Sequence, residues 1–268
     1  MNTAIFSGVL SGSALPSLKT KLQHPLPIFQ MKLFDCHFHI TDGEQHYGIQ
    51  PDARNVIFNY ISEYEQKKEE LKQSDCISLI FEFRNALDFV EKEVNTGRVV
   101  ALKIHSRIQQ LEETDYPLIF DCYEERFARK QIPVIFDAFY FGADFRYQPN
   151  LQRMAEFARR FKETKVIIAH SGGFRALEYF LHLKELPNIH FDLSFSLAYL
   201  SYASVYQDFK NLLRFASPEK LLFGTDFPFV SAKVQLERIL EIFSELNMPE
   251  EKQQKILFQN SYDLFFRK

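Results

Sequence analysis

The chain has 268 residues, of which 46% are hydrophobic and 25% are charged, and its formal net charge is −3. This length suits one larger globular domain. The charge balance lacks the basic excess of a nucleic-acid-binding protein, and no apolar run reaches the ~18 residues of a membrane span. We therefore expect a small-molecule substrate rather than a nucleic acid or membrane partner, and the composition is compatible with a homo-oligomer.

The sequence contains three cysteines, Cys36, Cys76 and Cys122. They are widely spaced and form no C-x-x-C pair, so they indicate neither a disulfide framework nor a zinc ribbon. We therefore expect a reducing, cytoplasmic environment.

Residues 1–30 are rich in Ser, Thr, Leu and Pro and show neither helical nor alternating periodicity. They have no basic segment before their short apolar patch, which argues against a signal peptide. We expect a loose N-terminal extension, which a mis-assigned upstream start would explain. One domain should follow over residues 31–268.

From residue 31 onward, short apolar runs alternate with longer segments of helical period. The predicted strands are residues 33–40, 55–60, 76–83, 99–105, 134–139, 165–170, 189–195 and 220–226. The predicted helices are residues 62–73, 86–93, 118–131, 151–162, 174–183, 202–215, 232–246 and 250–266.

Strands that alternate with helices imply right-handed βαβ units and a parallel sheet covered by helices. The number of such units predicts an α/β fold, a (β/α)₈ TIM barrel. A doubly wound open sheet is the alternative, but no G-x-G-x-x-G follows the first predicted strand, so a dinucleotide-binding fold would lack its phosphate loop.

The first strand contains two histidines, His37 and His39, separated by one residue. Residues i and i+2 of a strand point to the same face, so both imidazoles can converge on one point. Cys36 and Phe38 should then face the other way. Two neutral imidazole nitrogens on a stiff strand are half of a metal site.

Ionisable residues also close most of the other predicted strands. They are Glu82 and Arg84, Lys103 and His105, Asp137, His170 and Asp226. Each one alone fits a helix cap or a turn, but a charged residue at the end of an apolar strand is costly to desolvate unless it is paired. Their repetition predicts an active site at the carboxyl ends of the strands, where barrel enzymes have theirs.

Five motifs occur in a fixed order along the chain: H-x-H at 37–39, A-L-K-I-H at 101–105, I-P-V-I-F-D at 132–137, V-I-I-A-H-S-G-G at 166–173 and L-L-F-G-T-D-F-P at 221–228. In this order they resemble the amidohydrolase superfamily, and most closely its amidohydrolase-2 branch of metal-dependent hydrolases and related decarboxylases. The resemblance runs from about residue 31 to the C-terminus and implies a TIM barrel.

The resemblance implies a role for each matching residue. His37 and His39 correspond to the metal pair of the first strand. Asp226 corresponds to the aspartate that ligates the metal and accepts a proton from the attacking water. His170 corresponds to the histidine that ligates metal or hydrogen-bonds the substrate carbonyl. Lys103 lies where some branches have a lysine that can be carbamylated to bridge two metals.

The chain departs from the family pattern at Asp137, where a third metal-ligating histidine is expected. An aspartate is a competent ligand of Zn²⁺, Mn²⁺ or Fe²⁺, so the site can survive with a changed metal preference. We expect one divalent ion, with zinc favoured over manganese or iron, bound by His37, His39, Asp137 and Asp226. Metal-free operation stays open, because a lactonase group of this branch is understood to hydrolyse without a metal.

These residues predict a hydrolase that cleaves an amide, ester or lactone with a metal-activated water, with Asp226, His170 and Lys103 as catalytic groups. The planar fork of Arg84 suits a substrate carboxylate, although Arg84 could equally be a structural partner of Glu82 or Asp137. A decarboxylase on the same scaffold, a barrel that only binds, and a related metal-dependent deoxyribonuclease are the alternatives.

Overall fold

The structure is a computed structural model that describes residues 31–40 and 48–266. The chain divides into two units, Met1–Met31 and Lys32–Lys268, and the description below concerns the second unit. The predicted loose extension over residues 1–30 lies outside the described residues and stays a prediction. None of the described helices is long and apolar enough to cross a membrane.

Eight parallel strands form one sheet in the order in which they occur along the chain. They are β1 (Phe34–Phe38), β2 (Ala53–Phe58), β3 (Asp75–Ile80), β4 (Val99–Ile104), β5 (Val134–Phe136), β6 (Val166–Ile168), β7 (Ile189–Asp192) and β8 (Leu221–Leu222). Backbone bonds from the Cys36 N–H to Phe223 O, at 2.9 Å, and from the Asp226 N–H to His37 O, at 2.7 Å, join the first strand to the segment that directly follows the last strand. The predicted (β/α)₈ barrel is confirmed, and the open-sheet alternative is wrong.

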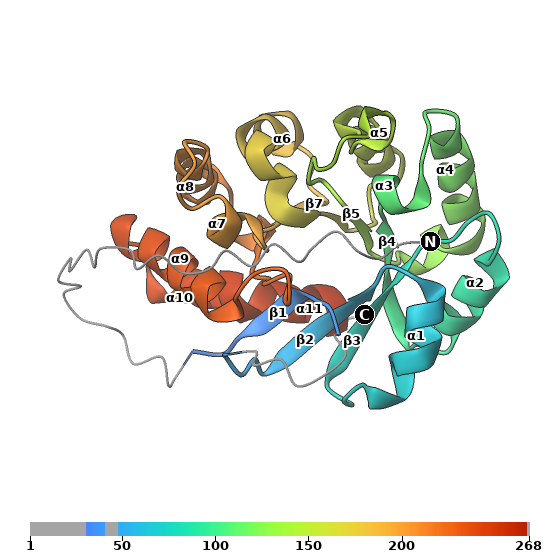
Figure 1. Ribbon diagram of the computed structural model, residues 1–268, viewed down its shortest axis with the longest axis horizontal. Coiled ribbons are helices and arrows are strands. Elements are labelled where there is room, and N and C mark those ends of the chain that lie inside the picture. Colours follow the sequence, from blue (N-terminus) through green and yellow to red (C-terminus); the bar gives the residue numbers. More distant parts are fainter. Residues whose placement is uncertain (1–30, 41–47, 267–268) are drawn as a thin grey trace. The chain divides into compact units, whose positions relative to one another are not determined.

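Helices connect the strands and lie outside them (Figure 1). The α-helices are α1 (Ile61–Lys67), α2 (Leu87–Asn95), α3 (Ser106–Gln109), α4 (Asp115–Arg126), α5 (Leu151–Arg160), α6 (Ala176–Leu183), α7 (Ser196–Tyr199), α8 (Tyr206–Phe215), α9 (Ala232–Glu245), α10 (Glu250–Gln254) and α11 (Asn260–Phe266). Short 3₁₀ segments are η2 (Lys68–Glu70), η3 (Ala128–Lys130), η4 (Phe145–Tyr147), η5 (Ala169–Arg175) and η6 (Pro218–Lys220), and η7 (Lys255–Gln259) is a π-helix. The short helices α3 and α7, at the carboxyl ends of β4 and β7, were not predicted from the sequence.

Several strands end earlier than the sequence predicted. The sixth and eighth strands were expected to run to residues 170 and 226, but β6 ends at Ile168 and β8 at Leu222. His170 and Asp226 instead have left-handed backbone angles, with φ of 58° and 61°. This conformation ends the regular strand and turns the side chain toward the carboxyl end of the barrel.

A bulge interrupts the first strand beside the histidines. Asp35 pairs with Arg54 and Phe38 pairs with Val56, so three steps along β1 match two along β2. The bulge breaks the alternation of side chains. Cys36 was expected to face away from the histidines, and that expectation is wrong, because Cys36 packs inside the barrel with Phe34 and Ile57.

Polar side chains from the next two strands hold the bulge. The Asn55 side chain donates to the Cys36 carbonyl at 3.0 Å, and the Ser78 hydroxyl donates to Asn55 Oδ1 at 2.9 Å. Both side chains are fully buried. These bonds satisfy a carbonyl that the irregular pairing would otherwise leave without a partner.

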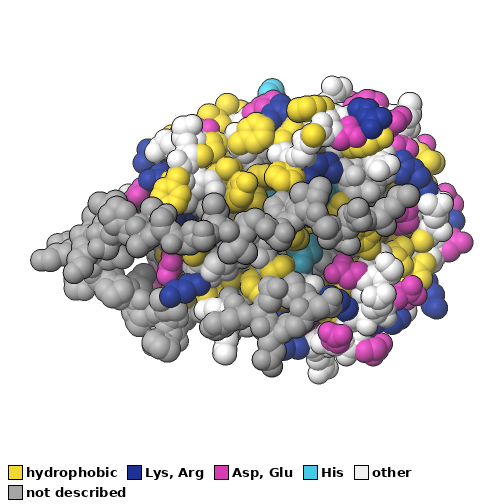
Figure 2. Space-filling model, viewed as in Figure 1, with side chains coloured by type: hydrophobic (Ala, Val, Ile, Leu, Met, Phe, Trp, Pro, Cys, Tyr) yellow, Lys and Arg dark blue, Asp and Glu magenta, His cyan; other side chains and the backbone are white. Residues whose placement is uncertain are grey.

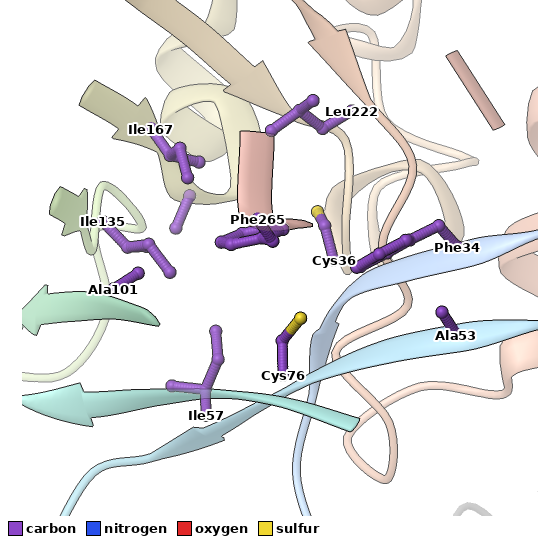
Figure 3. Close-up of a cluster of buried hydrophobic side chains, with 11 residues drawn as sticks. Phe34, Cys36, Ala53, Ile57, Cys76, Ala101, Ile135, Ile167, Leu222 and Phe265 are labelled. Carbon is purple, nitrogen blue, oxygen red and sulfur yellow. The ribbon is translucent and has the colours of Figure 1, made fainter. Parts of the chain in front are cut away.

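The barrel interior beneath the strand ends is apolar (Figure 3). Its members are Phe34, Cys36, Ala53, Ile57, Cys76, Ala101, Ile135, Ile167, Ala169, Leu222 and Phe265. Phe265 comes from α11 and stacks on Phe34 with ring centroids 5.7 Å apart. Because side chains alternate along a strand, Lys103 follows Ala101 and Asp137 follows Ile135 on the same face, one layer nearer the carboxyl end.

Replacing Phe265 by Ala should lower the free energy of unfolding by about 3–5 kcal/mol, because it leaves a cavity between α11 and the strands. Its neighbour Phe266 is 41% exposed and provides the control. Urea unfolding of both variants measures the difference. Equal losses for Phe265→Ala and Phe266→Ala would contradict the assigned role of Phe265 in the core.

Candidate active site

Asp226 lies between the two histidines of the H-x-H motif. One carboxylate oxygen, Oδ1, is 3.4 Å from His37 Nε2 and 3.3 Å from His39 Nε2. His37, His170 and Asp226 form the one group of three potential metal-ligating residues found among the described residues, with their donor atoms within 4.8 Å of one another. The structure therefore brings together the first, sixth and last predicted site segments.

The hydrogen bonds of the Nδ1 atoms of His37 and His39 show which ring nitrogens face this centre. His37 Nδ1 lies 2.6 Å from Asp192 Oδ2, and His39 Nδ1 lies 2.8 Å from the Ile57 carbonyl oxygen. An ionised carboxylate and a carbonyl only accept hydrogen bonds, so both Nδ1 atoms donate. Burial and the nearby Lys103 lower the pKa of His37 to about 4, so its ring is neutral near pH 7.

The resulting donor set fits a divalent metal ion. Two imidazole Nε2 lone pairs face one carboxylate oxygen at 3.3–3.4 Å, and such groups repel each other unless a cation or a proton lies between them. Metal-ligating histidines usually donate their other ring N–H to a carboxylate or a backbone carbonyl, as His37 and His39 do. His37, His39 and Asp226 are thus suited to hold zinc.

Lys103 projects into the same centre and is 1% exposed. Its Nζ lies 3.4 Å from His37 Nε2, the atom that a metal would use. Burial lowers the pKa of Lys103, although Asp137, Asp226 and Asp192 oppose the shift. The ammonium therefore gives up its proton at a smaller cost than an exposed lysine would.

Asp137 lies beside His170 and His105. Its Oδ2 is 3.5 Å from His105 Nε2 and 3.6 Å from His170 Nε2. Its buried Oδ1 accepts no hydrogen bond from the described residues, and the guanidinium of Arg107 is 3.9 Å away. Burial alone would raise the pKa of Asp137, but His105, His170 and Lys103 hold it well below its usual range.

His170 has the opposite electrostatic setting from His37. Burial lowers the pKa of His170, but the carboxylates of Asp226 and Asp137 outweigh burial, and the net shift is upward. The ring therefore keeps its second proton to a higher pH than an ordinary histidine does. A protonated Nε2 can donate a hydrogen bond to a substrate carbonyl oxygen.

The residues after His170 have an unusual backbone that only glycine accommodates easily. Ser171 has a φ of 51° and Gly172 a φ of 88°. A Cβ on Gly172 would lie 2.5 Å from the ring of Tyr179. The two glycines of the H-S-G-G motif thus allow a tight turn that keeps His170 against the barrel centre.

Arg84 forms an ion pair that the sequence did not suggest. Its guanidinium lies 2.6 Å from Asp115 Oδ2 and donates to the Gln109 carbonyl at 2.9 Å. Its side chain is 36% exposed. The structural partner is therefore Asp115 rather than the side chains of Glu82 or Asp137, and binding of a substrate carboxylate by Arg84 stays a prediction.

Two residues of the site were not among the predicted site residues. Asp192, at the end of β7, contacts His37, and Ser194, two residues later, contacts His170. His105, which the sequence placed at a strand end without a role, contacts Asp137. Asp192 closes an apolar strand, as the other site residues do, so the strand-end pattern contained a signal for it. Ser194 has no such signal, because a serine after a strand is an ordinary turn residue.

The comparison with known proteins agrees with this geometry. The amidohydrolase family model matches residues 79–267. The chain belongs to the amidohydrolase family. The recognition made from the motifs is thereby confirmed. No curated protein matches the chain.

Several solved structures share the fold of this amidohydrolase. An uncharacterised TIM-barrel protein from Bordetella bronchiseptica is 16% identical, with a TM-score of 0.60 over 79% of this chain and 76% of that chain. An apo structure from Agrobacterium tumefaciens is 13% identical, with a TM-score of 0.59 over 90% and 98%. A protein described as an amidohydrolase II is 14% identical, with a TM-score of 0.54 over 87% and 99%. At these identities, the likeness shows the fold alone.

The stability of the metal-free protein should depend on pH through its buried histidines. Burial lowers the pKa of His37 to about 4 and that of His105 to about 3. Between pH ~6.5 and ~4 the unfolded chain therefore binds more protons, and the free energy of unfolding should fall with decreasing pH by at most ~1.4 kcal/mol per unit for each histidine.

Urea unfolding across this pH window measures that slope. The lowered pKa values of Asp137, Asp192 and Asp226 begin to contribute below about pH 5, where the unfolded carboxyls bind protons, so the histidine slope is read between pH ~6.5 and ~5. The raised pKa of His170 contributes stability that is lost only above the ordinary histidine value. His105→Gln should flatten the slope, and an unchanged slope would contradict the buried, neutral state of His105.

Asp137→Asn tests whether Asp137 binds metal. If it is a ligand, as its unpartnered oxygen supports, metal affinity should fall while the melting temperature changes little, since a neutral amide oxygen is the poorer donor. If it serves only as the charge partner of His105 and His170, metal content should stay unchanged and the stability should fall by about 3–5 kcal/mol. Elemental analysis and thermal unfolding of the same variant distinguish the two results.

Proposed function

We propose that this amidohydrolase is a metal-dependent hydrolase that cleaves an amide, ester or lactone bond of a small molecule. The observation that carries the proposal is the position of Asp226. Its Oδ1 lies within 3.4 Å of the Nε2 atoms of His37 and His39, and the Nδ1 atoms of both rings already donate hydrogen bonds. A site of this kind holds a metal and a base at the same point.

His37, His39 and Asp226 would hold the ion, with Asp137 as the proposed further ligand. Zinc suits this set of imidazole and carboxylate donors, and manganese or iron would bind the same donors. When bound, the ion would lower the pKa of its water to about 7 and polarise the carbonyl under attack.

The protein's own residues would manage the protons. The pKa of Asp226 is lowered because the charge of His170, the largest of the opposing influences, outweighs the effect of burial, so its carboxylate is ionised near pH 7. It can take a proton from the attacking water and return it to the leaving group. His170 and Lys103 would donate hydrogen bonds to the oxygen on which negative charge develops.

The substrate is proposed to be a small molecule that reaches the carboxyl ends of the strands. Arg84, near this end, is the proposed contact for a substrate carboxylate, and a substrate there would have to compete with Asp115. Acidic and basic side chains are interspersed over the face drawn in Figure 2. We propose no nucleic acid partner, because the formal net charge of the chain is −3. A reducing cytoplasm is supported by the free cysteines Cys36, Cys76 and Cys122.

Asp226→Asn should lower kcat by roughly 10²–10⁴-fold, because it removes the general base. The purified protein would be loaded with zinc and tested on a panel of amides, esters and lactones. Asp121→Asn serves as the matched control, since Asp121 is exposed and pairs with Arg160 at the surface.

The products decide between the candidate reactions. Incorporation of ¹⁸O from labelled water into a product carboxylate supports hydrolysis. Release of CO₂ from a carboxylic acid substrate without such incorporation would overturn the proposal in favour of the decarboxylase. A zinc-loaded protein that binds ligands of the panel but converts none of them would instead indicate a barrel that only binds.

A further inference from the structure

A single carboxylate on β7 connects two histidines that are distant in sequence, one directly and one through a serine. Asp192 is 1% exposed and lies at the end of β7. Its Oδ2 accepts hydrogen bonds from His37 Nδ1 at 2.6 Å and from the Ser194 hydroxyl at 2.8 Å. Its Oδ1 accepts the Ser194 backbone N–H at 2.8 Å. Both oxygens are occupied, so the orientation of the carboxylate is fixed.

The same contacts determine where the hydrogens lie. The Ser194 hydroxyl has one hydrogen, and an ionised Asp192 can only accept it. Ser194 Oγ also lies 3.1 Å from His170 Nδ1, so in that contact the ring nitrogen must donate. His37 and His170 therefore both carry a hydrogen on Nδ1, and both direct Nε2 away from Asp192, toward the centre that contains Asp226.

The turn that carries Ser194 has a strained backbone at Phe195. Phe195 has φ 61° and ψ −57°, which is rare for a bulky residue, and the Ser196 N–H donates to Ser194 O at 2.5 Å. The Ser196 hydroxyl donates to the backbone carbonyl of His170 at 2.9 Å. The turn thus contacts His170 twice, at its ring through Ser194 and at its backbone through Ser196.

We propose that Asp192 and Ser194 are positioning residues, which hold the Nδ1 hydrogens of His37 and His170 and so present both Nε2 atoms to the reaction centre. Asp192 acts on His37 directly and on His170 through Ser194. The proposal rests on the proposed function only where it assigns the Nε2 atoms of His37 and His170 to contact with a metal or a substrate. Sequence motifs of the site include neither residue.

The first test uses the metal-free protein and does not depend on activity. Long-range ¹H–¹⁵N NMR at alkaline pH, where the rings are neutral, should show His37 and His170 as Nδ1–H tautomers. Ser194→Ala should shift His170 toward a mixture of tautomers and leave His37 unchanged. Asp192→Asn should disturb both rings. Ser217→Ala, which removes an exposed hydroxyl that bonds Glu219 at the surface, should leave the ring-nitrogen signals of both histidines unchanged.

The second test measures zinc affinity by competition with a chromogenic chelator. Asp192→Asn should weaken binding by roughly 10–100-fold, the usual effect of removing the partner of a ligating histidine. Ser217→Ala, the surface control, should leave the affinity within about twofold of the wild type. With an active substrate, Ser194→Ala should lower kcat while KM stays close to the wild-type value.

Unchanged tautomers of His170 in folded Ser194→Ala would overturn the proposal, and so would equal disturbance of His37 and His170 by that variant. Thermal unfolding shows whether each variant is folded, and Ser194→Ala keeps the test valid if Asp192→Asn fails to fold. A wild-type protein that binds no zinc but has the expected tautomers would contradict the metal-dependent function and leave the positioning role intact.

Discussion

The removal of ionised side chains from water is the constraint on which this structure depends. Lys103, Asp137, Asp192 and Asp226 are each less than a tenth exposed. An unpaired charge in such a place costs several kcal/mol, and the apolar layer of Ala101, Ile135 and Ile167 beneath them offers no hydrogen bonds. The charges are therefore satisfied by one another and by the histidines, hydroxyls and backbone N–H groups that surround them. Their mutual pairing keeps the pKa values of the three carboxylates low despite burial, and lowers the cost of holding basic groups among them.

Bringing this many charged side chains to one centre requires backbone conformations that regular strands do not provide. A straight strand directs every second side chain inward, at intervals of two residues. The bulge in β1 brings Cys36 into the core while His37 still reaches the centre, and left-handed residues turn His170 and Asp226 inward after their strands end. Irregular backbone of this kind costs roughly 1–3 kcal/mol per residue and is retained where the surroundings hold it in place. Here the hydrogen bonds of Asn55, Ser194 and Ser196 do so.

The sequence predicted what depends on periodicity and on strand order. Alternating strands and helices were enough for the barrel, and the strand-end positions of His37, His39 and Asp226 were enough to anticipate a common site. A period-two pattern contains no information about a bulge, so the orientation of Cys36 was predicted wrongly. The partner of Arg84 also escaped prediction, because Asp115 belongs to α4 and approaches only through tertiary packing. Asp192 could have been found from the strand-end pattern, whereas Ser194 becomes a site residue only through the strained turn at Phe195.

The glycine of the G-T-D motif shows how closely these features are coupled. A Cβ on Gly224 would lie 2.8 Å from Asp192 Oδ1 and 3.0 Å from the Cβ atoms of both His37 and Ser194. The backbone after β8 therefore passes through a space that admits no methyl group, with His37 on one side and Asp192 and Ser194 on the other. Asp226 comes two positions later, and its N–H bonds to the His37 carbonyl at 2.7 Å. The close approach at Gly224 thus brings together three chain segments that are distant in sequence. As a result, the carboxylate of Asp226 lies beside His37 Nε2 and that of Asp192 lies beside His37 Nδ1.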